Sequence, residues 1–168
     1  TRSPDGTLGA TWNPITGCLN HVGGLCIGGG FPCYAHRLAH GRLRQQYSHG
    51  GGELPSELTD RYYNMGDFED DPFYPRFWPE RLDELNPVYG QDNRAKFRGI
   101  FVCDMSDLFG IGIPEEWTRK VLDRIREFPL HRFYLLTKQP QNLAKWKFPD
   151  NCWVGVTACN QQMAERAI

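Results

Sequence analysis

The chain has 168 residues, a length that suits one domain or part of a larger one. Its 19 basic and 20 acidic residues give a net charge of −1, so the net charge does not support a nucleic-acid partner. No apolar run is long enough to span a membrane and no secretory signal opens the sequence, so we expect a cytoplasmic protein without a membrane partner. Because the chain begins at Thr1 and stops at Ile168 inside a helical pattern, we expect residues 1–168 to be a single domain truncated at its carboxyl end.

The amino-terminal part of the sequence combines turn signals, glycines and cysteines. Residues 1–17 are predicted to be a loop, because Asn13-Pro14 and an earlier Pro-Asp-Gly signal turns. Residues 17–33 contain six glycines and three cysteines, a composition that indicates a loop wrapped closely around a bound group. A helical pattern then begins at Cys33 and ends before the glycines at 50–52.

The middle of the sequence, residues 53–95, is predicted to be an irregular insertion. It contains five prolines and the acidic run 67–71, and only the segment from Pro79 to Leu85 suits a short helix.

The pattern becomes regular after residue 96. Apolar runs at 99–103, 132–136 and 152–156 predict three buried strands. Pro114 and a stripe of apolar residues predict a helix that ends near Phe128, and two shorter helices are expected from Pro140 and from Gln161. Strands that alternate with helices predict an α/β fold built from parallel βαβ units, either an open doubly wound sheet or part of a (β/α) barrel. The tryptophans are expected in the core: Trp12, Trp117, Trp146 and Trp153.

Polar residues follow each predicted strand, and they form the candidate binding residues. They are Asp104, Ser106 and Asp107 after the first strand, Thr137 and Lys138 after the second, and Thr157 and Asn160 after the third. Because parallel strands end at one edge of a sheet, we expect these side chains to share one face. Two alternatives stay open, since Asp107 could instead cap its own loop and Lys138 could be a solvated side chain.

Three cysteines in the glycine-rich loop form the strongest chemical signal. Cys18 and Cys26 are separated by seven residues, and Cys26 and Cys33 by six. Thiolates are ligands for zinc or iron–sulfur centres, and an iron–sulfur cluster held by three cysteines leaves one iron open. Two alternatives remain, namely a zinc site completed by His21 or His36, and three unligated thiols. The other cysteines, Cys103, Cys152 and Cys159, are predicted to be mostly packing thiols.

Several segments resemble an uncharacterised family that is common in phages and bacteria and is usually described as radical-SAM-like. The similar segments are Thr11-Trp12-Asn13-Pro14-Ile15-Thr16-Gly17-Cys18, Cys33-Tyr34-Ala35, residues 77–82, residues 100–110, residues 135–140 and residues 153–156. In that family the last two cysteines are more often two residues apart, whereas six residues separate them here.

The resemblance implies a partial or full (β/α) barrel of radical-SAM type. It implies a [4Fe–4S] cluster on Cys18, Cys26 and Cys33, and S-adenosylmethionine (SAM) bound to the open iron. The strand-end residues Asp104, Ser106, Asp107, Lys138 and Thr157 are then expected to bind SAM. A reductant such as flavodoxin or ferredoxin is the implied partner, and the resemblance names no substrate. We therefore carry three hypotheses: a radical-SAM-type enzyme, a zinc-stabilised binding module without redox chemistry, and a cluster protein that has lost catalysis.

Overall fold

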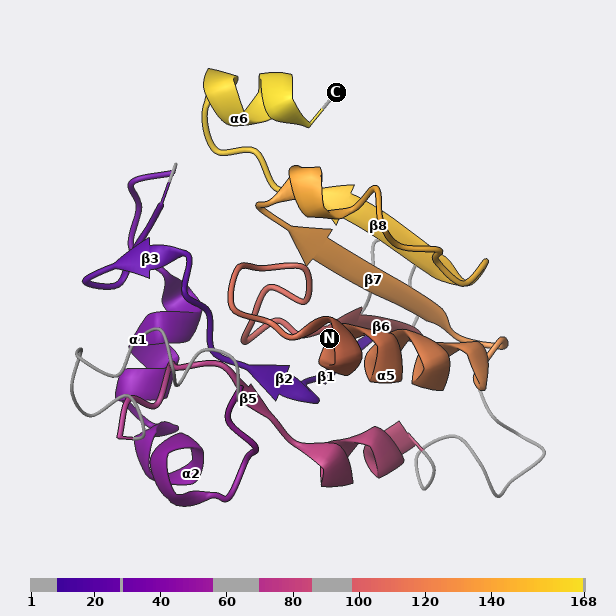
Figure 1. Ribbon diagram of the computed structural model, residues 1–168, viewed down its shortest axis with the longest axis horizontal. Coiled ribbons are helices and arrows are strands. Elements are labelled where there is room, and N and C mark those ends of the chain that lie inside the picture. The colour runs from indigo at the N-terminus through magenta and orange to yellow at the C-terminus, as the bar shows by residue number, and fades with distance from the viewer. Residues whose placement is uncertain (1–8, 28, 56–69, 86–97, 168) are drawn as a thin grey trace.

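The computed structural model describes residues 9–27, 29–55, 70–85 and 98–167. Its centre is a four-stranded parallel sheet in the order β1-β6-β7-β8 (Figure 1). The strands are β1 (Gly9–Trp12), β6 (Gly99–Val102), β7 (Arg132–Thr137) and β8 (Cys152–Val156). The α/β class and the parallel βαβ arrangement are therefore confirmed, while the described residues form an open sheet and no closed barrel.

One face of the sheet is covered by α5 (Glu115–Arg126), which connects β6 to β7. Pro114 precedes this helix, and Glu115 and Glu116 lie in its first turn, where the helix dipole favours negative charge. Apolar residues at helical spacing, including Val121 and Ile125, are fully buried in the core. The strand residues that join them in this core include Ile100, Phe133 and Leu135.

The opposite face of the sheet presents a row of residues in register: Thr11, Phe101, Tyr134 and Trp153. Trp153 is 57 % exposed, so the prediction that places it in the core is wrong. Successive strand residues point to opposite faces, and here the neighbouring Val154 takes the core side. The Trp153 indole is covered in part by the guanidinium of Arg132, 4.3 Å from the ring centroid.

The second region, which we call the cysteine lobe, comprises residues 17–53. It consists of short elements: the hairpin of β3 (His21–Val22) and β4 (Leu25–Cys26), then α1 (Tyr34–His40) and α2 (Arg44–His49). A small second core supports it, made of Ala35, Ala39, Tyr47, Phe73, Trp78 and Met105. Figure 1 shows the lobe beside the ends of β6, β7 and β8, where the strand arrows point.

The remaining elements connect these two regions. Two of them form a short antiparallel pair, β2 (Ile15–Thr16) and β5 (Arg76–Phe77). The others are the 3-10 helices η1 (Pro79–Glu84) and η2 (Pro140–Asn142) and the last helix, α6 (Gln161–Arg166). The side chain of Asn160 caps α6 by accepting a hydrogen bond from the backbone N–H of Met163 at 2.8 Å.

Three predictions about the amino-terminal half need correction. Residues 9–12 are not a loop but strand β1, which pairs with β6 through its backbone. The glycine-rich segment contains a hairpin, because Gly23 and Gly24, with φ of +56° and +80°, turn the chain between β3 and β4. The helix expected from Cys33 is split in two at Gly41, whose ψ of −116° is not helical.

Part of the predicted insertion at 53–95 lies outside the described residues, namely 56–69 and 86–95. The first of these segments includes the beginning of the acidic run. The short helix expected near Pro79 is present as η1. None of the helices in the described part of the chain is long and apolar enough to cross a membrane.

Candidate functional site at the cysteine loop

The cysteine lobe is joined to the end of β6 by backbone and side-chain hydrogen bonds at Gly17. The Gly17 N–H donates to the carbonyl of Met105 at 2.9 Å, and the Ser106 hydroxyl donates to the carbonyl of Gly17 at 2.6 Å. Gly17 has a φ of +82°, and a Cβ there would lie 2.3 Å from the carbonyl oxygen of Tyr74. Only glycine suits this position, so the residue before Cys18 fixes where the loop leaves the sheet.

Asp104 is the second connection between the two regions. Its carboxylate accepts a hydrogen bond from the Asn13 side-chain amide at 2.6 Å, and its backbone carbonyl accepts one from the Tyr34 hydroxyl. The Asn13 side-chain oxygen accepts from the N–H of Met105 at 3.1 Å. The chain turns sharply just before this point, because Cys103 has a φ of 55°, the one positive value among the described residues other than glycine. The turn brings Asp104 against α1, which starts directly after Cys33.

Asp107 is buried and links the ends of β6 and β7. One carboxylate oxygen accepts hydrogen bonds from the Thr137 hydroxyl and the Lys138 N–H, both at 3.0 Å, and the other accepts from the Phe109 N–H at 3.2 Å. Burial raises the pKa of Asp107, and these hydrogen bonds oppose that rise. Both carboxylate oxygens of Asp107 are thus engaged inside the protein. Of the two roles that the sequence leaves open, binding a ligand and capping its own loop, the structure favours capping.

The thiols of Cys18, Cys26 and Cys33 lie close enough to influence one another electrostatically, and all three are free. Burial raises the pKa of Cys18 to about 12, and nearby Asp107, Cys33 and Cys26 add to this rise. The sulfur of Cys18 accepts a hydrogen bond from the backbone N–H of Asn20 at 3.3 Å, which lowers the pKa. The site therefore gathers three soft donors in one loop, and two of them, Cys18 and Cys26, are desolvated by burial.

Lys138 lies at the same place, at the end of β7. Burial raises the pKa of Cys26, and the positive charge of Lys138 lowers it. The Lys138 ammonium is 5.9 Å from the ring centroid of Phe31, a residue of the cysteine loop. The predicted strand-end lysine is therefore a neighbour of the cysteines, where its charge favours a thiolate.

A pocket of about 130 Å³ separates the cysteine loop from the ends of β7 and β8. Its walls come from both regions and include Asn20, Ile27, Lys138, Thr157, Met163 and Arg166. The backbone N–H of Thr157 donates to the carbonyl of Thr137 at 2.8 Å, which keeps the two strand ends together. Lys138 and Thr157 thus face a shared pocket, whereas Asp104, Ser106 and Asp107 hold the surrounding loops in place.

The two histidines considered as zinc ligands belong to a histidine cluster of their own. The ring of His36 stacks on His40, with centroids 4.0 Å apart, and meets the ring of His21 edge-on at 4.9 Å. His40 lies 3.4 Å from the carboxylate of Asp71. In the described ranges no group of three or more His, Cys, Asp or Glu side chains is arranged to hold a metal ion.

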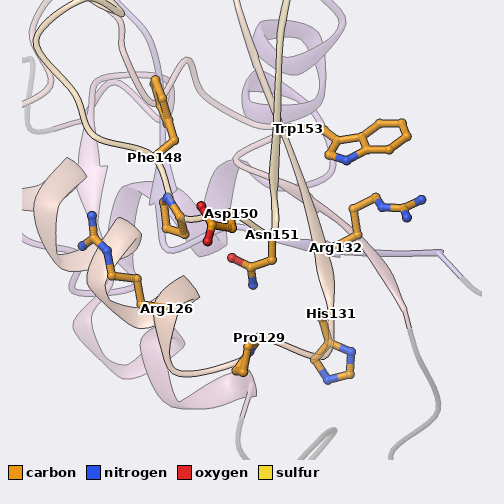
Figure 2. A pocket seen from close by; sticks show the side chains of 9 residues that line it. Arg126, Pro129, His131, Arg132, Phe148, Asp150, Asn151 and Trp153 are labelled. Carbon is orange, nitrogen blue, oxygen red and sulfur yellow. The ribbon is translucent and has the colours of Figure 1, made fainter.

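A larger cavity, of about 660 Å³, lies at the other end of the sheet, where β7 and β8 begin. Figure 2 shows Arg132 and Trp153 on one side of it and Phe148 and Asp150 on the other. Its positive charges have partners, because Arg126 is paired with Asp123 and Arg132 stacks on Trp153. Although this cavity is larger, the smaller pocket beside the cysteines is the better candidate site, because it lies next to three thiols.

Comparison with known proteins assigns the chain to one family. Residues 7–168 match the family described as "Protein of unknown function (DUF5131)". The chain belongs to the DUF5131 family. No curated protein and no solved structure matches it. The chemistry of this DUF5131 protein must therefore be argued from the site itself.

Two site residues have roles that the sequence does not reveal. Asn13 and Tyr34 stand on either side of the cysteine loop, and their hydrogen bonds to residues 104 and 105 cross about seventy to ninety positions of the chain. Only their positions in the sequence could have indicated a role at the site, because Asn13 precedes the cysteine loop and Tyr34 follows its last cysteine.

Proposed function

We propose that this protein holds a [4Fe–4S] cluster on Cys18, Cys26 and Cys33 and uses it to cleave SAM reductively, as a radical-SAM-type enzyme. The observation on which the proposal rests is the grouping of three free, mutually interacting thiols at the carboxyl end of a parallel sheet. Ligand sites of open α/β sheets form at this edge.

The donors fit an iron–sulfur cluster. The thiols are soft ligands, they form no disulfide, and the Asn20 N–H already donates to the sulfur of Cys18. Hydrogen bonds of this kind stabilise cluster-bound sulfur and tune its reduction potential. Because burial raises the pKa of Cys18 to about 12, this thiol is protonated at neutral pH until a metal displaces its proton.

The number of thiols favours a cluster over a single structural zinc ion, which takes four protein ligands. One zinc ion requires its ligands to converge on one point at bonding distance, and the described side chains have no such arrangement. A four-iron cluster binds each thiolate at a different corner, so its ligands surround a larger volume.

The pocket between the loop and the strand ends, at about 130 Å³, has room for the amino-acid end of SAM but not for the whole molecule. When bound, the cluster would supply an electron to the SAM sulfonium, whose cleavage gives methionine and a 5′-deoxyadenosyl radical. The chain's own contribution is to bind and orient: Lys138 and Arg166 line the pocket and suit a carboxylate. Met163 and Ile27 supply apolar wall, and the substrate from which the radical takes hydrogen remains to be found by experiment.

The proposal includes a redox partner and a compartment. The electron would come from a low-potential carrier such as flavodoxin or ferredoxin. A reducing compartment, the cytoplasm, suits six unpaired cysteines.

The test is SAM cleavage by the full-length protein, purified and reconstituted without air. With dithionite and SAM, we expect a brown protein that forms 5′-deoxyadenosine, detected by liquid chromatography and mass spectrometry. Cys33→Ala should abolish the product, whereas Cys152→Ala, at the far end of β8, should retain it. A colourless protein that contains zinc would favour the zinc-stabilised binding module. A reduced cluster that forms no 5′-deoxyadenosine would show a cluster protein without this catalysis.

A further inference from the structure

A separate cavity of about 390 Å³ lies between the loops that follow β6 and β7. Its walls come from the loop 108–113, the start of α5 and the segment 139–146. It neighbours the small pocket beside the cysteine loop, because Gln139 and Gln141 line both. Cavities of this size, at the edge where parallel strands end, are typical binding sites for small molecules.

Two hydrogen-bond donors in the lining of this cavity have no acceptor among the described residues. They are the side-chain amide nitrogen of Gln139 and the indole nitrogen of Trp146. The Gln139 residue is 8 % exposed, and both nitrogens are shielded from bulk solvent. Buried donors without a partner destabilise a protein, and native structures contain few of them. Two such donors in one cavity lining therefore point to a ligand that supplies the acceptors.

The orientation of the Gln139 amide is fixed by its neighbours. Its oxygen accepts a hydrogen bond from the backbone N–H of Ile111 at 3.1 Å, and its backbone N–H donates to the Thr137 hydroxyl at 2.9 Å. Gly110 lies against the amide nitrogen, since a Cβ at this glycine would be 3.2 Å from it. Because Ile111 already occupies the amide oxygen, the side chain of Gln139 has N–H groups to offer to a ligand.

The other hydrogen-bonding and charged groups of the lining have partners. The Asn142 amide and the Thr118 hydroxyl donate to backbone carbonyls of the loop 108–113, at 2.8 and 2.9 Å. The ammonium of Lys145 lies 2.6 Å from the carboxylate of Glu115, so the two charges of the lining cancel. The apolar part of the lining includes Leu108, Phe109, Ile111 and Ile113.

We propose that this cavity binds a small molecule that has one carboxylate and an apolar body, and that the carboxylate accepts hydrogen bonds from Gln139 and Trp146. A carboxylate only accepts, which complements two groups that only donate. The first turn of α5 borders the cavity, and the helix dipole favours negative charge there. Since the charges of the lining cancel, a monoanion suits the cavity better than a phosphate dianion. This inference is independent of the proposed function.

The first experiment observes the two donors directly in the full chain. We expect phenylacetate or isovalerate, added to isotope-labelled protein, to shift the indole N–H signal of Trp146 and the side-chain amide signals of Gln139 in heteronuclear NMR spectra. Trp146→Phe identifies the indole signal by its loss. The signal of Trp153, which is exposed at the other end of the sheet, should stay in place. If neither acid moves the Trp146 and Gln139 signals in a millimolar titration, the proposal is wrong.

The second experiment tests the chemistry of the ligand. Phenylacetamide has the same ring but an uncharged amide, and ethylbenzene has the ring without any acceptor. We expect the Kd of phenylacetamide to be severalfold higher than that of phenylacetate, and ethylbenzene to leave the Trp146 indole signal unshifted. Equal affinity for the acid and its amide would overturn the assignment of a carboxylate.

The third experiment removes each donor separately. Gln139→Glu keeps an oxygen for the N–H of Ile111 but replaces the donor with a negative charge, so the Kd for phenylacetate should rise about tenfold or more. Trp146→Phe keeps an aromatic ring without the N–H and should raise the Kd severalfold. The matched controls are Gln45→Glu, exposed on α2, and Trp153→Phe, and both should bind as the wild type does.

Circular dichroism shows whether each variant folds before its affinity is measured. Because Gln139 is buried, Gln139→Glu could unfold the protein, and Trp146→Phe then tests the proposal alone. A folded Trp146→Phe variant that binds phenylacetate as tightly as the wild type would overturn the proposed contact.

Discussion

The sheet and the cysteine lobe of this DUF5131 protein acquire their order by different means. The sheet strands and α5 bury large apolar side chains completely, including Ile100, Val121 and Phe133. The lobe consists of two-residue strands and of helices of six and seven residues, and its own core is small. Helices this short are not stable by themselves, so other contacts must position the lobe.

Those contacts are a few hydrogen bonds that reach from the lobe to the strand ends. They join Gly17 to Met105 and Ser106, and Tyr34 to Asp104. Substitutions in the sheet should therefore change the stability of the whole molecule. Substitutions at these contacts should mainly change the position of the lobe and, under the proposed function, its affinity for the cluster.

The largest effect is expected at the sheet core. Phe133→Ala should lower the free energy of unfolding by about 3–5 kcal/mol, because it removes a fully buried ring and leaves a cavity. Leu136→Ala, in the same strand but 44 % exposed, is the matched control and should cost much less. Urea unfolding followed by circular dichroism measures both, and equal losses would contradict the description of the sheet as the stable core.

Asp107 tests the connection between the two strand ends. Asp107→Ala leaves the Thr137 hydroxyl and two backbone N–H groups without their acceptor. Since each buried unpaired donor costs roughly 1–3 kcal/mol, we expect a loss of about 3 kcal/mol or more. Asp107→Asn, which retains one carbonyl oxygen, should lose less. If both variants unfold at the urea midpoint of the wild type, the linking role is wrong.

Alkaline pH tests the burial of the thiols in both regions. Burial raises the pKa of Cys18 and Cys103 from 9.0 to about 12. The folded protein therefore holds these protons more tightly than the unfolded chain, so stability is fully present below about pH 9 and falls as pH rises toward 12. Thermal unfolding of metal-free protein between pH 8 and about pH 11 should show a falling Tm, and Cys103→Ala should weaken the slope. A Tm that rises over this range would contradict the burial of these thiols.

Tyr34 gives the smallest expected effect and separates the two regions most clearly. Tyr34→Phe removes the hydrogen bond to the carbonyl of Asp104 and should cost about 0.5–1.5 kcal/mol. Because α1 begins next to Cys33, the variant should bind iron less tightly even though the sheet stays folded. Iron retention against a chelator measures this, with Tyr134→Phe, on the open sheet face, as the control. Equal retention in both variants would show that the lobe is positioned without this contact.

The regular half of the fold could be predicted from the sequence because local patterns encode it. The apolar runs at 99–103, 132–136 and 152–156 and the apolar stripe of α5 identify the sheet and its covering helix. Strand β1 was missed because Gly9-Ala10 has little apolar pattern, and its place depends on backbone pairing with β6, ninety positions away. Side chains alternate between the two faces of a strand, and the sequence does not show which set faces the core. The exposure of Trp153 on the open face was therefore not predicted.

The candidate site was predictable in its residue types but less so in their roles. The cysteine spacing and the polar strand ends point to one region of the structure, since parallel strands end at one edge. Other roles depend on hydrogen bonds between distant parts of the chain. Examples are the link that Asp107 makes between two strand ends and the connections of Asn13 and Tyr34 to residues 104 and 105. Cys159 is grouped with the packing thiols on the sequence alone, but it is exposed on the loop between β8 and α6.

The most direct test of the central claim is the iron and sulfide content of the full-length protein reconstituted without air. The account predicts about four irons and four sulfides per chain, with a broad absorbance near 400 nm that dithionite bleaches, as for a [4Fe–4S] cluster. Cys18→Ala, Cys26→Ala and Cys33→Ala should each lose most of the iron, and Cys152→Ala should keep it. A wild-type protein that binds no iron, or three cysteine variants that retain it in full, would contradict the account.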